Sequence, residues 1–179
     1  MKQIKKVAIA LFCVFLLLFC ACNRYSGRED GTPPPAPVTF ETDLIVVLNE
    51  IRLMAHFQQR SPGFGLLTVT APENLQGLEM RFEGTECQIS YRGLNFGADV
   101  SKLPESAFGN ALIQILAARL SEAEVTRTYR EGKWRFEGNS AAGGFLLVQD
   151  AETGDYEYIS IPSIDLTIQF VNFQRNTAV

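Results

Sequence analysis

The sequence predicts a mostly β fold of the α+β class: a curved antiparallel sheet (a half-barrel) with one main helix packed on its concave face. Three observations lead to this prediction. From residue 40 onward, apolar side chains recur mostly at every second position, which is typical of antiparallel strands with one buried and one solvated face. One segment near residue 110 has helical spacing instead. A single helix is too small to cover a wide sheet, so we expect the sheet to curl around it.

The first 21 residues have the pattern of an export signal. Three lysines stand among the first six residues, an apolar run covers residues 7–19, and the small residue Ala21 precedes Cys22. The ending at residues 19–22 resembles a bacterial lipobox, whose cysteine is acylated and becomes the first residue of the mature protein. The resemblance implies that residues 1–21 are removed and that lipidated Cys22 anchors an extracytoplasmic protein to the cell membrane.

Two alternatives to the lipoprotein signal stay open. In the first, residues 1–21 are an ordinary secretory signal and Cys22 is unmodified. In the second, the apolar run is a retained transmembrane helix. The run from residue 7 to residue 21 is shorter than the roughly 20 residues that a spanning helix needs, which argues against the second.

The composition of the exported part limits its partners. Removal of three lysines with the signal leaves 13 basic and 20 acidic side chains, a net charge of −7. Such a chain has no basic footprint for nucleic acid, and a covalent anchor rather than charge would hold it at a membrane. The remaining length suits one domain. Cys87 would be its one unlipidated cysteine, so we expect no intramolecular disulfide and a small buried hydrophobic residue there.

Residues 22–39 are predicted to form a disordered tether, followed by one domain at residues 40–179. Four of the five residues 33–37 are proline, which favours an extended polyproline II conformation and opposes a strand.

Within the domain, ten segments have the alternation of strands. They are residues 40–48, 51–58, 65–70, 78–83, 87–92, 125–130, 133–137, 145–149, 156–161 and 164–173. Hairpin turns are expected at residues 131–132 and 150–155, and a Gly/Ala/Ser loop at residues 139–144.

The helix is predicted over residues 104–120, where Phe108, Leu112 and Leu116 recur at helical spacing and Pro104 suits the first turn. Such a helix is about 25 Å long, whereas the sheet would be roughly 40–50 Å wide. The remaining apolar face needs another cover. A half-barrel with a residual apolar groove is one solution, and a two-layer sandwich with the helix at one end is the alternative.

Four stretches are similar to the LolA/LolB lipoprotein-carrier superfamily. They are a glycine-led strand ending at a proline (residues 65–72), two meander strands (78–82 and 87–91) and the closing hairpin and strand (154–173). The resemblance spans about residues 40–173. It implies a half-barrel that holds an acyl chain or another apolar ligand.

We therefore expect a membrane-anchored lipoprotein that binds a lipid or other apolar ligand in its groove. The alternative is a non-catalytic interaction module whose leftover apolar surface or sheet edge meets another envelope protein. Candidate ligand-lining residues fall on apolar faces of the predicted elements: Leu67, Val69, Met80, Phe82, Leu112, Leu116, Ile168 and Phe170.

The motifs of an enzyme are missing from the sequence. The single histidine, His56, is expected on the polar side of a strand, and no G-x-S-x-G elbow or phosphate-binding loop occurs. One histidine and one cysteine cannot form a four-ligand zinc site. The acidic residues at 150–155 lack the spacing of a calcium loop, and Glu79 and Glu83 are expected to be solvated charges. We predict no catalysis, cofactor or metal.

Overall fold

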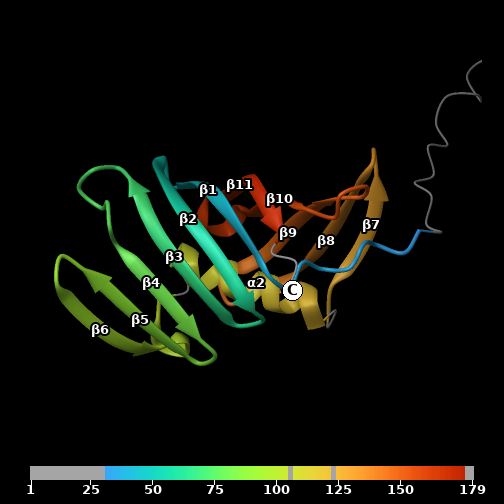
Figure 1. Cartoon of the computed structure of the whole chain (residues 1–179). Helices are drawn as coiled ribbons and strands as arrows, with labels where there is room; N and C mark the ends of the chain where they lie inside the picture. Colours follow the sequence, from blue (N-terminus) through green and yellow to red (C-terminus); the bar gives the residue numbers. More distant parts are fainter. Residues whose placement is uncertain (1–30, 105–106, 122–123, 176–179) are drawn as a thin grey trace, which may run out of the picture.

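The computed structural model describes residues 31–104, 107–121 and 124–175. These residues form one open antiparallel sheet in the order β6-β5-β4-β3-β2-β1-β11-β10-β9-β8-β7, curved around helix α2 (Figure 1). The predicted half-barrel is thereby confirmed, and no sandwich forms because all eleven strands belong to the same sheet. The predicted signal, Cys22 and the first part of the tether lie outside the described residues. Within the described ranges, no helix is both long and apolar enough to cross a membrane.

All ten predicted strands form, and one strand was not predicted. The strands are β1 (Phe40–Leu48), β2 (Ile51–Ser61), β3 (Phe64–Ala71), β4 (Glu79–Glu83), β5 (Glu86–Tyr91), β6 (Leu94–Asp99), β7 (Thr126–Arg130), β8 (Lys133–Ser140), β9 (Gly143–Asp150), β10 (Tyr156–Ile161) and β11 (Leu166–Arg175). The helical segments are η1 (Val100–Lys102), α2 (Phe108–Ser121) and η2 (Pro162–Ile164). The missed strand is β6, whose Asn95 and Gly97 are poor strand formers and whose residues are mostly exposed on both faces.

Helix α2 begins at Phe108, four residues later than predicted. The N–H of Ala107 donates to the carbonyl of Pro104 over 2.9 Å, so Pro104 belongs to a turn before the helix. Gly109, which lowers helix propensity, lies where the helix approaches β4. A Cβ atom at this position would come within 3.1 Å of the Phe82 ring, so glycine permits the close contact.

A bulge in β11 gathers aromatic rings at one end of the half-barrel. The β1–β11 register shifts between Glu41 and Asp43, and Asn172 on β11 has a positive φ of 54°. Because of the extra residue, Phe170 and Phe173 both pack with the core, and the Phe173 ring stacks on Phe40 at 4.6 Å. The rings in contact at this end are those of Phe40, Phe57, Tyr156, Phe170 and Phe173.

The loop predicted at residues 139–144 is wrong. Strand β8 runs to Ser140 and β9 begins at Gly143, with Ser140 paired to Gly143 across a tight turn. The Ser140 hydroxyl also donates to the Gly143 carbonyl over 3.0 Å. Backbone pairing thus extends through residues whose small side chains bury little surface.

The acidic turn at residues 150–155 is a hairpin connection, as predicted. The Asp150 carboxylate accepts hydrogen bonds from the backbone N–H groups of Glu152 (2.9 Å) and Thr153 (2.7 Å). The Thr153 and Glu152 hydrogen bonds lower the pKa of Asp150 below its usual range. Backbone N–H groups thus satisfy the Asp150 carboxylate and stabilise the turn.

Candidate functional site

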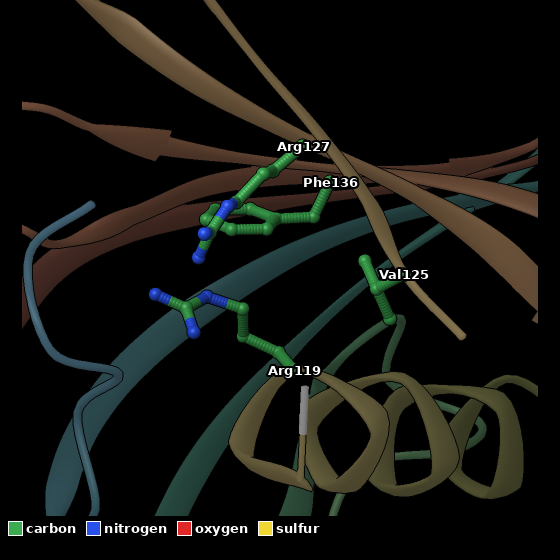
Figure 2. Close-up of a pocket in the computed structure, with 4 residues that line it drawn as sticks. All are labelled: Arg119, Val125, Arg127 and Phe136. Atoms are coloured by element: carbon green, nitrogen blue, oxygen red, sulfur yellow. The ribbon is translucent and has the colours of Figure 1, made fainter. Parts of the chain in front are cut away.

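A cavity of about 290 Å³ lies at the C-terminal end of α2. Its lining residues are Arg119 from α2, Val125 from the segment before β7, Arg127 from β7 and Phe136 from β8. Figure 2 shows Arg119 reaching from the helix toward Phe136 and Arg127. The cavity therefore forms where α2 ends beneath the β7 side of the sheet. Its volume is just below the roughly 300–1,000 Å³ that ligand pockets occupy.

Arg119 links three parts of the fold at this cavity. Its side chain is only 2% exposed. The guanidinium lies 4.1 Å from the centre of the Phe136 ring, a cation–π contact. Its Nη2 donates to Oε1 of Gln149 on β9 over 3.1 Å and to the carbonyl of Pro34 over 2.9 Å. Helix, sheet and N-terminal segment thus meet at one buried cation.

Residues 31–39 differ from the disordered tether expected over residues 22–39. They are extended but lie on the domain, with Pro33 and Pro37 buried. Nε2 of Gln149 approaches the Pro35 carbonyl at 3.5 Å, and Nε2 of Gln59 donates to the Val38 carbonyl over 2.9 Å. We call residues 31–39 the strap. Figure 1 shows the strap passing below the β7–β9 side of the sheet before it enters β1.

Tyr156 lies close to this junction, buried among the aromatic rings. It is 2% exposed, and its hydroxyl has no hydrogen-bond partner among the described residues. Burial raises the pKa of this hydroxyl well above its usual range, and the positive charges of Arg119 and Arg175 offset only part of the increase. The neutral phenol is therefore the form that fits this site.

Replacing Tyr156 by phenylalanine is expected to raise the free energy of unfolding by about 1 kcal/mol at pH 7, because a buried hydroxyl without a partner is removed. The advantage should grow at alkaline pH. Above pH about 10 the unfolded wild type loses the phenolic proton while the folded protein keeps it, so wild-type stability falls by about 1.4 kcal/mol per pH unit through this group. Urea unfolding of both proteins at neutral and alkaline pH measures the difference, and a difference that stays constant with pH would contradict the assignment.

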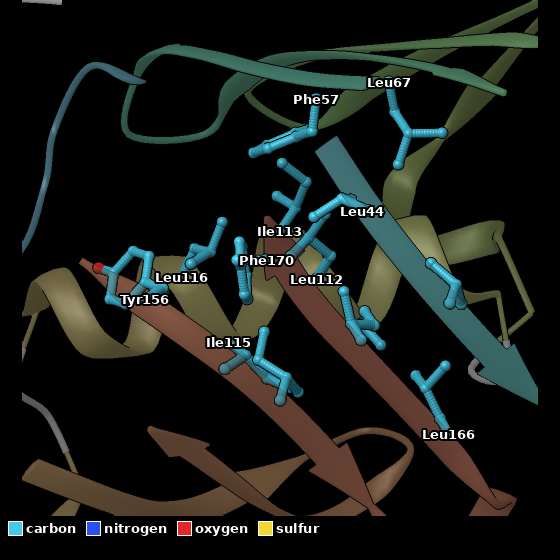
Figure 3. Packing of buried hydrophobic residues seen from close by; sticks show 14 of the residues in the cluster. Leu44, Phe57, Leu67, Leu112, Ile113, Ile115, Leu116, Tyr156, Leu166 and Phe170 are labelled. Atoms are coloured by element: carbon cyan, nitrogen blue, oxygen red, sulfur yellow. The ribbon is translucent and has the colours of Figure 1, made fainter. Parts of the chain in front are cut away.

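The eight candidate ligand-lining residues all belong to one buried cluster. Figure 3 labels four of them, Leu67, Leu112, Leu116 and Phe170, between α2 and the sheet. Their exposed fractions range from 0% to 8%. They come from β3 (Leu67, Val69), β4 (Met80, Phe82), α2 (Leu112, Leu116) and β11 (Ile168, Phe170). None is among the lining residues of the cavity at the end of α2. An apolar ligand would reach these side chains only if α2 moved away from the sheet.

The cavity residues were missed by the sequence interpretation, although one signal was present. Arg119 follows Leu116 by three positions, so it continues the apolar side of the helix, where a charged residue is unusual. Nothing local marks Val125, Arg127 or Phe136, because their role depends on how distant parts of the sheet meet the helix.

The polar groups considered for catalysis lie elsewhere. His56 is on the convex face, where its Nδ1 lies 2.9 Å from Oδ1 of Asp43. The amide of Asn172 donates to the same carboxylate over 2.9 Å and is the main cause of the lowered pKa of Asp43. Cys87 is fully buried as expected, and burial raises the pKa of its thiol. In the part of the chain that the structure describes, no three His, Cys, Asp or Glu side chains gather in a way that could hold a metal ion.

A second hollow, of about 510 Å³, lies over β4, β5 and β6. Glu79, Arg81 and Gln88 contribute to its lining, so it is a polar depression rather than an apolar groove. Glu79 belongs to this open surface, in agreement with its predicted role as a solvated charge.

No family model and no curated protein sequence matches this chain. Among solved structures, it is similar to an uncharacterized conserved protein from Thermus thermophilus, with a TM-score of 0.52 and 10% identity over 80% of this chain and 82% of that chain. It is also similar to a LolA superfamily protein from Nitrosomonas europaea, with a TM-score of 0.43 and 7% identity over 82% and 90% of the two chains. At these identities the likeness concerns the fold alone. The architecture that the sequence resemblance implied, a half-barrel around a helix, is present in the structure itself.

Proposed function

We propose that this chain is a non-catalytic, membrane-anchored extracytoplasmic lipoprotein that binds a lipid or another apolar ligand within its half-barrel. The observation that carries the proposal is the cavity at the end of the only long helix in the described residues. Helix α2 has 14 residues and is about 21 Å long, whereas eleven strands make a sheet about 50 Å wide. The helix therefore leaves part of the concave face for other cover.

The composition of the cavity suits an amphiphile. Val125 and Phe136 offer apolar contact, while Arg119 and Arg127 bring guanidinium groups to the same space. The apolar body of a ligand would lie against the first pair and its polar end near the second. A cavity of this size holds only part of a long acyl chain, so binding of such a chain requires the cavity to widen.

Native mass spectrometry with organic extraction tests the ligand. The protein would be residues 22–179 with Cys22→Ala, exported with a signal that does not direct lipidation. We expect a co-purifying mass of an apolar compound and uptake of the neutral fluorescent probe N-phenyl-1-naphthylamine. Val125→Arg, which places a charge in the cavity, should abolish uptake. The matched control Val47→Arg alters an exposed residue on β1 and should not. A clean apo mass without probe uptake would overturn the proposal.

The anchor is tested separately in the intact chain. With the native signal, Cys22→Ala should move the protein from the membrane fraction to the soluble fraction, because the acyl group would be its only attachment. Retention of this variant in membranes would instead support an uncleaved helix at residues 7–21.

An interaction module is the second candidate function, and the edge strand β6 favours it. Leu94 and Phe96 on β6 are 59% and 58% exposed. The opposite edge, β7, carries Arg127 and Arg130, and charged residues protect sheet edges from pairing, whereas β6 has no charged side chain before Asp99. Edge β6 is therefore the better acceptor for a strand of an envelope protein.

Phe96→Lys should abolish capture of such a partner in crosslinking of intact envelopes, because it places a charge on the apolar edge. Thr128→Lys on β7 is the matched control and should leave capture unchanged. Equal recovery of the partner with both variants would exclude β6 as the interface.

A further inference from the structure

The strap is held by side chains that are buried in the domain. Five polar or charged residues are buried among the described residues, and three of them, Gln59, Arg119 and Gln149, direct nitrogen atoms at strap carbonyls. The contacts run along the segment: Arg119 to Pro34, Gln149 to Pro35, and Gln59 to Pro37 (3.4 Å) and Val38. Burial of an amide or guanidinium is costly unless it is hydrogen-bonded. The strap carbonyls help to satisfy these groups, together with the Gly154 carbonyl, to which Nε2 of Gln149 donates over 2.7 Å.

The chemistry of the strap matches these donors. Proline has no N–H, so the four prolines of the strap offer carbonyl acceptors only, and a polyproline II chain has no internal hydrogen bonds to break. Shape agrees with chemistry at Gly154, which has φ +73°. A Cβ there would lie 3.0 Å from Cβ of Pro34, so the β9–β10 turn approaches the strap closely. The strap is therefore held by close packing as well as by hydrogen bonds.

The strap and the cavity share one side chain. Arg119 lines the cavity and also donates to the Pro34 carbonyl. Figure 2 shows the guanidinium of Arg119 between the strap ribbon and the side chains of Phe136 and Arg127. If the strap leaves, Arg119 loses a fixed partner on its outer side, and the cavity loses part of its support there.

We propose that the strap is a releasable support of the ligand site, which it holds through Arg119, docked when the half-barrel is empty and displaced when a ligand enters. The inference rests on the proposed function and extends it, because it names the moving part and its connection to the membrane. The docked strap follows the domain from Gly31, which lies close to Trp134 on β8, to Phe40, whereas a released strap would be attached to it only at Phe40. Release of these nine residues would add about 28 Å to the tether at the rise of polyproline II. Ligand entry would thus allow the domain to move farther from the membrane.

Two proline-to-glutamate substitutions in the strap, one at a buried and one at an exposed position, test whether the strap is docked. Pro37 is buried and Pro35 is exposed, so Pro37→Glu should release the strap while Pro35→Glu should leave it docked. Both variants are made in residues 22–179 with Cys22→Ala. Each creates one new site for a glutamate-specific protease, before Val38 in the first and before Ala36 in the second. Cleavage at residue 37 should be about tenfold faster than cleavage at residue 35, because a docked segment must open before it is cut.

Probe uptake tests the link to the cavity. Pro37→Glu should take up N-phenyl-1-naphthylamine several-fold faster than Pro35→Glu and the parent protein. Gln59→Leu, which removes the donor to Val38 without altering the strap, should increase uptake in the same direction even if Pro37→Glu folds poorly. Equal cleavage rates at the two sites, or faster cleavage without faster uptake, would overturn the proposal. If the parent and all three variants bind no probe, the proposed ligand binding fails, and its control by the strap fails with it. The cleavage rates still show whether the strap is docked.

Discussion

Replacing Leu116 by alanine is expected to lower the free energy of unfolding by about 2–5 kcal/mol and to increase uptake of an apolar ligand. Leu116 is 1% exposed, within the cluster that joins α2 to the sheet. Truncation of a buried leucine loses its transfer free energy and leaves a void in the packing. Because Leu116 precedes Arg119 by about one helical turn, this void should open toward the cavity at the end of α2.

Urea unfolding measures the first effect, and titration with N-phenyl-1-naphthylamine measures the second. Leu94→Ala is the matched control: the same atoms are removed from a side chain that is 59% exposed, and stability should change by about 0.5 kcal/mol or less. A loss of stability without increased uptake would show that the ligand does not enter between α2 and the sheet, and that the eight buried candidate residues serve packing only.

Strand alternation made most of the fold predictable. In β11, Leu166, Ile168 and Phe170 are buried, while Thr167 and Gln169 are more exposed, as the sequence predicted for a strand with one wet face. Strand β6 was missed because neither of its faces is well buried. Its sequence therefore lacks the clear alternation of apolar and polar residues that marks the other strands.

The strap and the cavity were not predictable for a different reason. Residues 31–39 have the composition of a free tether, and nothing local shows that Arg119, 85 residues beyond Pro34, will donate to its carbonyl. The partner Gln149 is 114 residues beyond Pro35. Local composition describes what a segment does alone, whereas these contacts depend on which distant side chains the curved sheet brings to one end.

Replacing Arg119 by methionine is expected to lower the free energy of unfolding by about 2–4 kcal/mol, because a desolvated cation–π contact and charged hydrogen bonds are lost together. Methionine keeps much of the apolar stem but offers nothing to Gln149 or Pro34. Arg119→Lys should recover less than half of the loss, because an ammonium lacks the planar face that stacks on Phe136 and the fork that donates to two acceptors.

Arg130→Met on β7 is the matched control. It removes the same charge but none of the contacts of Arg119 with Phe136, Gln149 and Pro34. Arg130 pairs with Glu131 at 3.4 Å, but its side chain is 65% exposed, so solvent screens the interaction and stability should change by about 0.5 kcal/mol or less. Equal unfolding free energies for Arg119→Met and Arg130→Met would mean that Arg119 is hydrated in solution, which is possible only if the strap is already released. A large difference between the two variants would show that helix, sheet and strap are held together through one buried guanidinium.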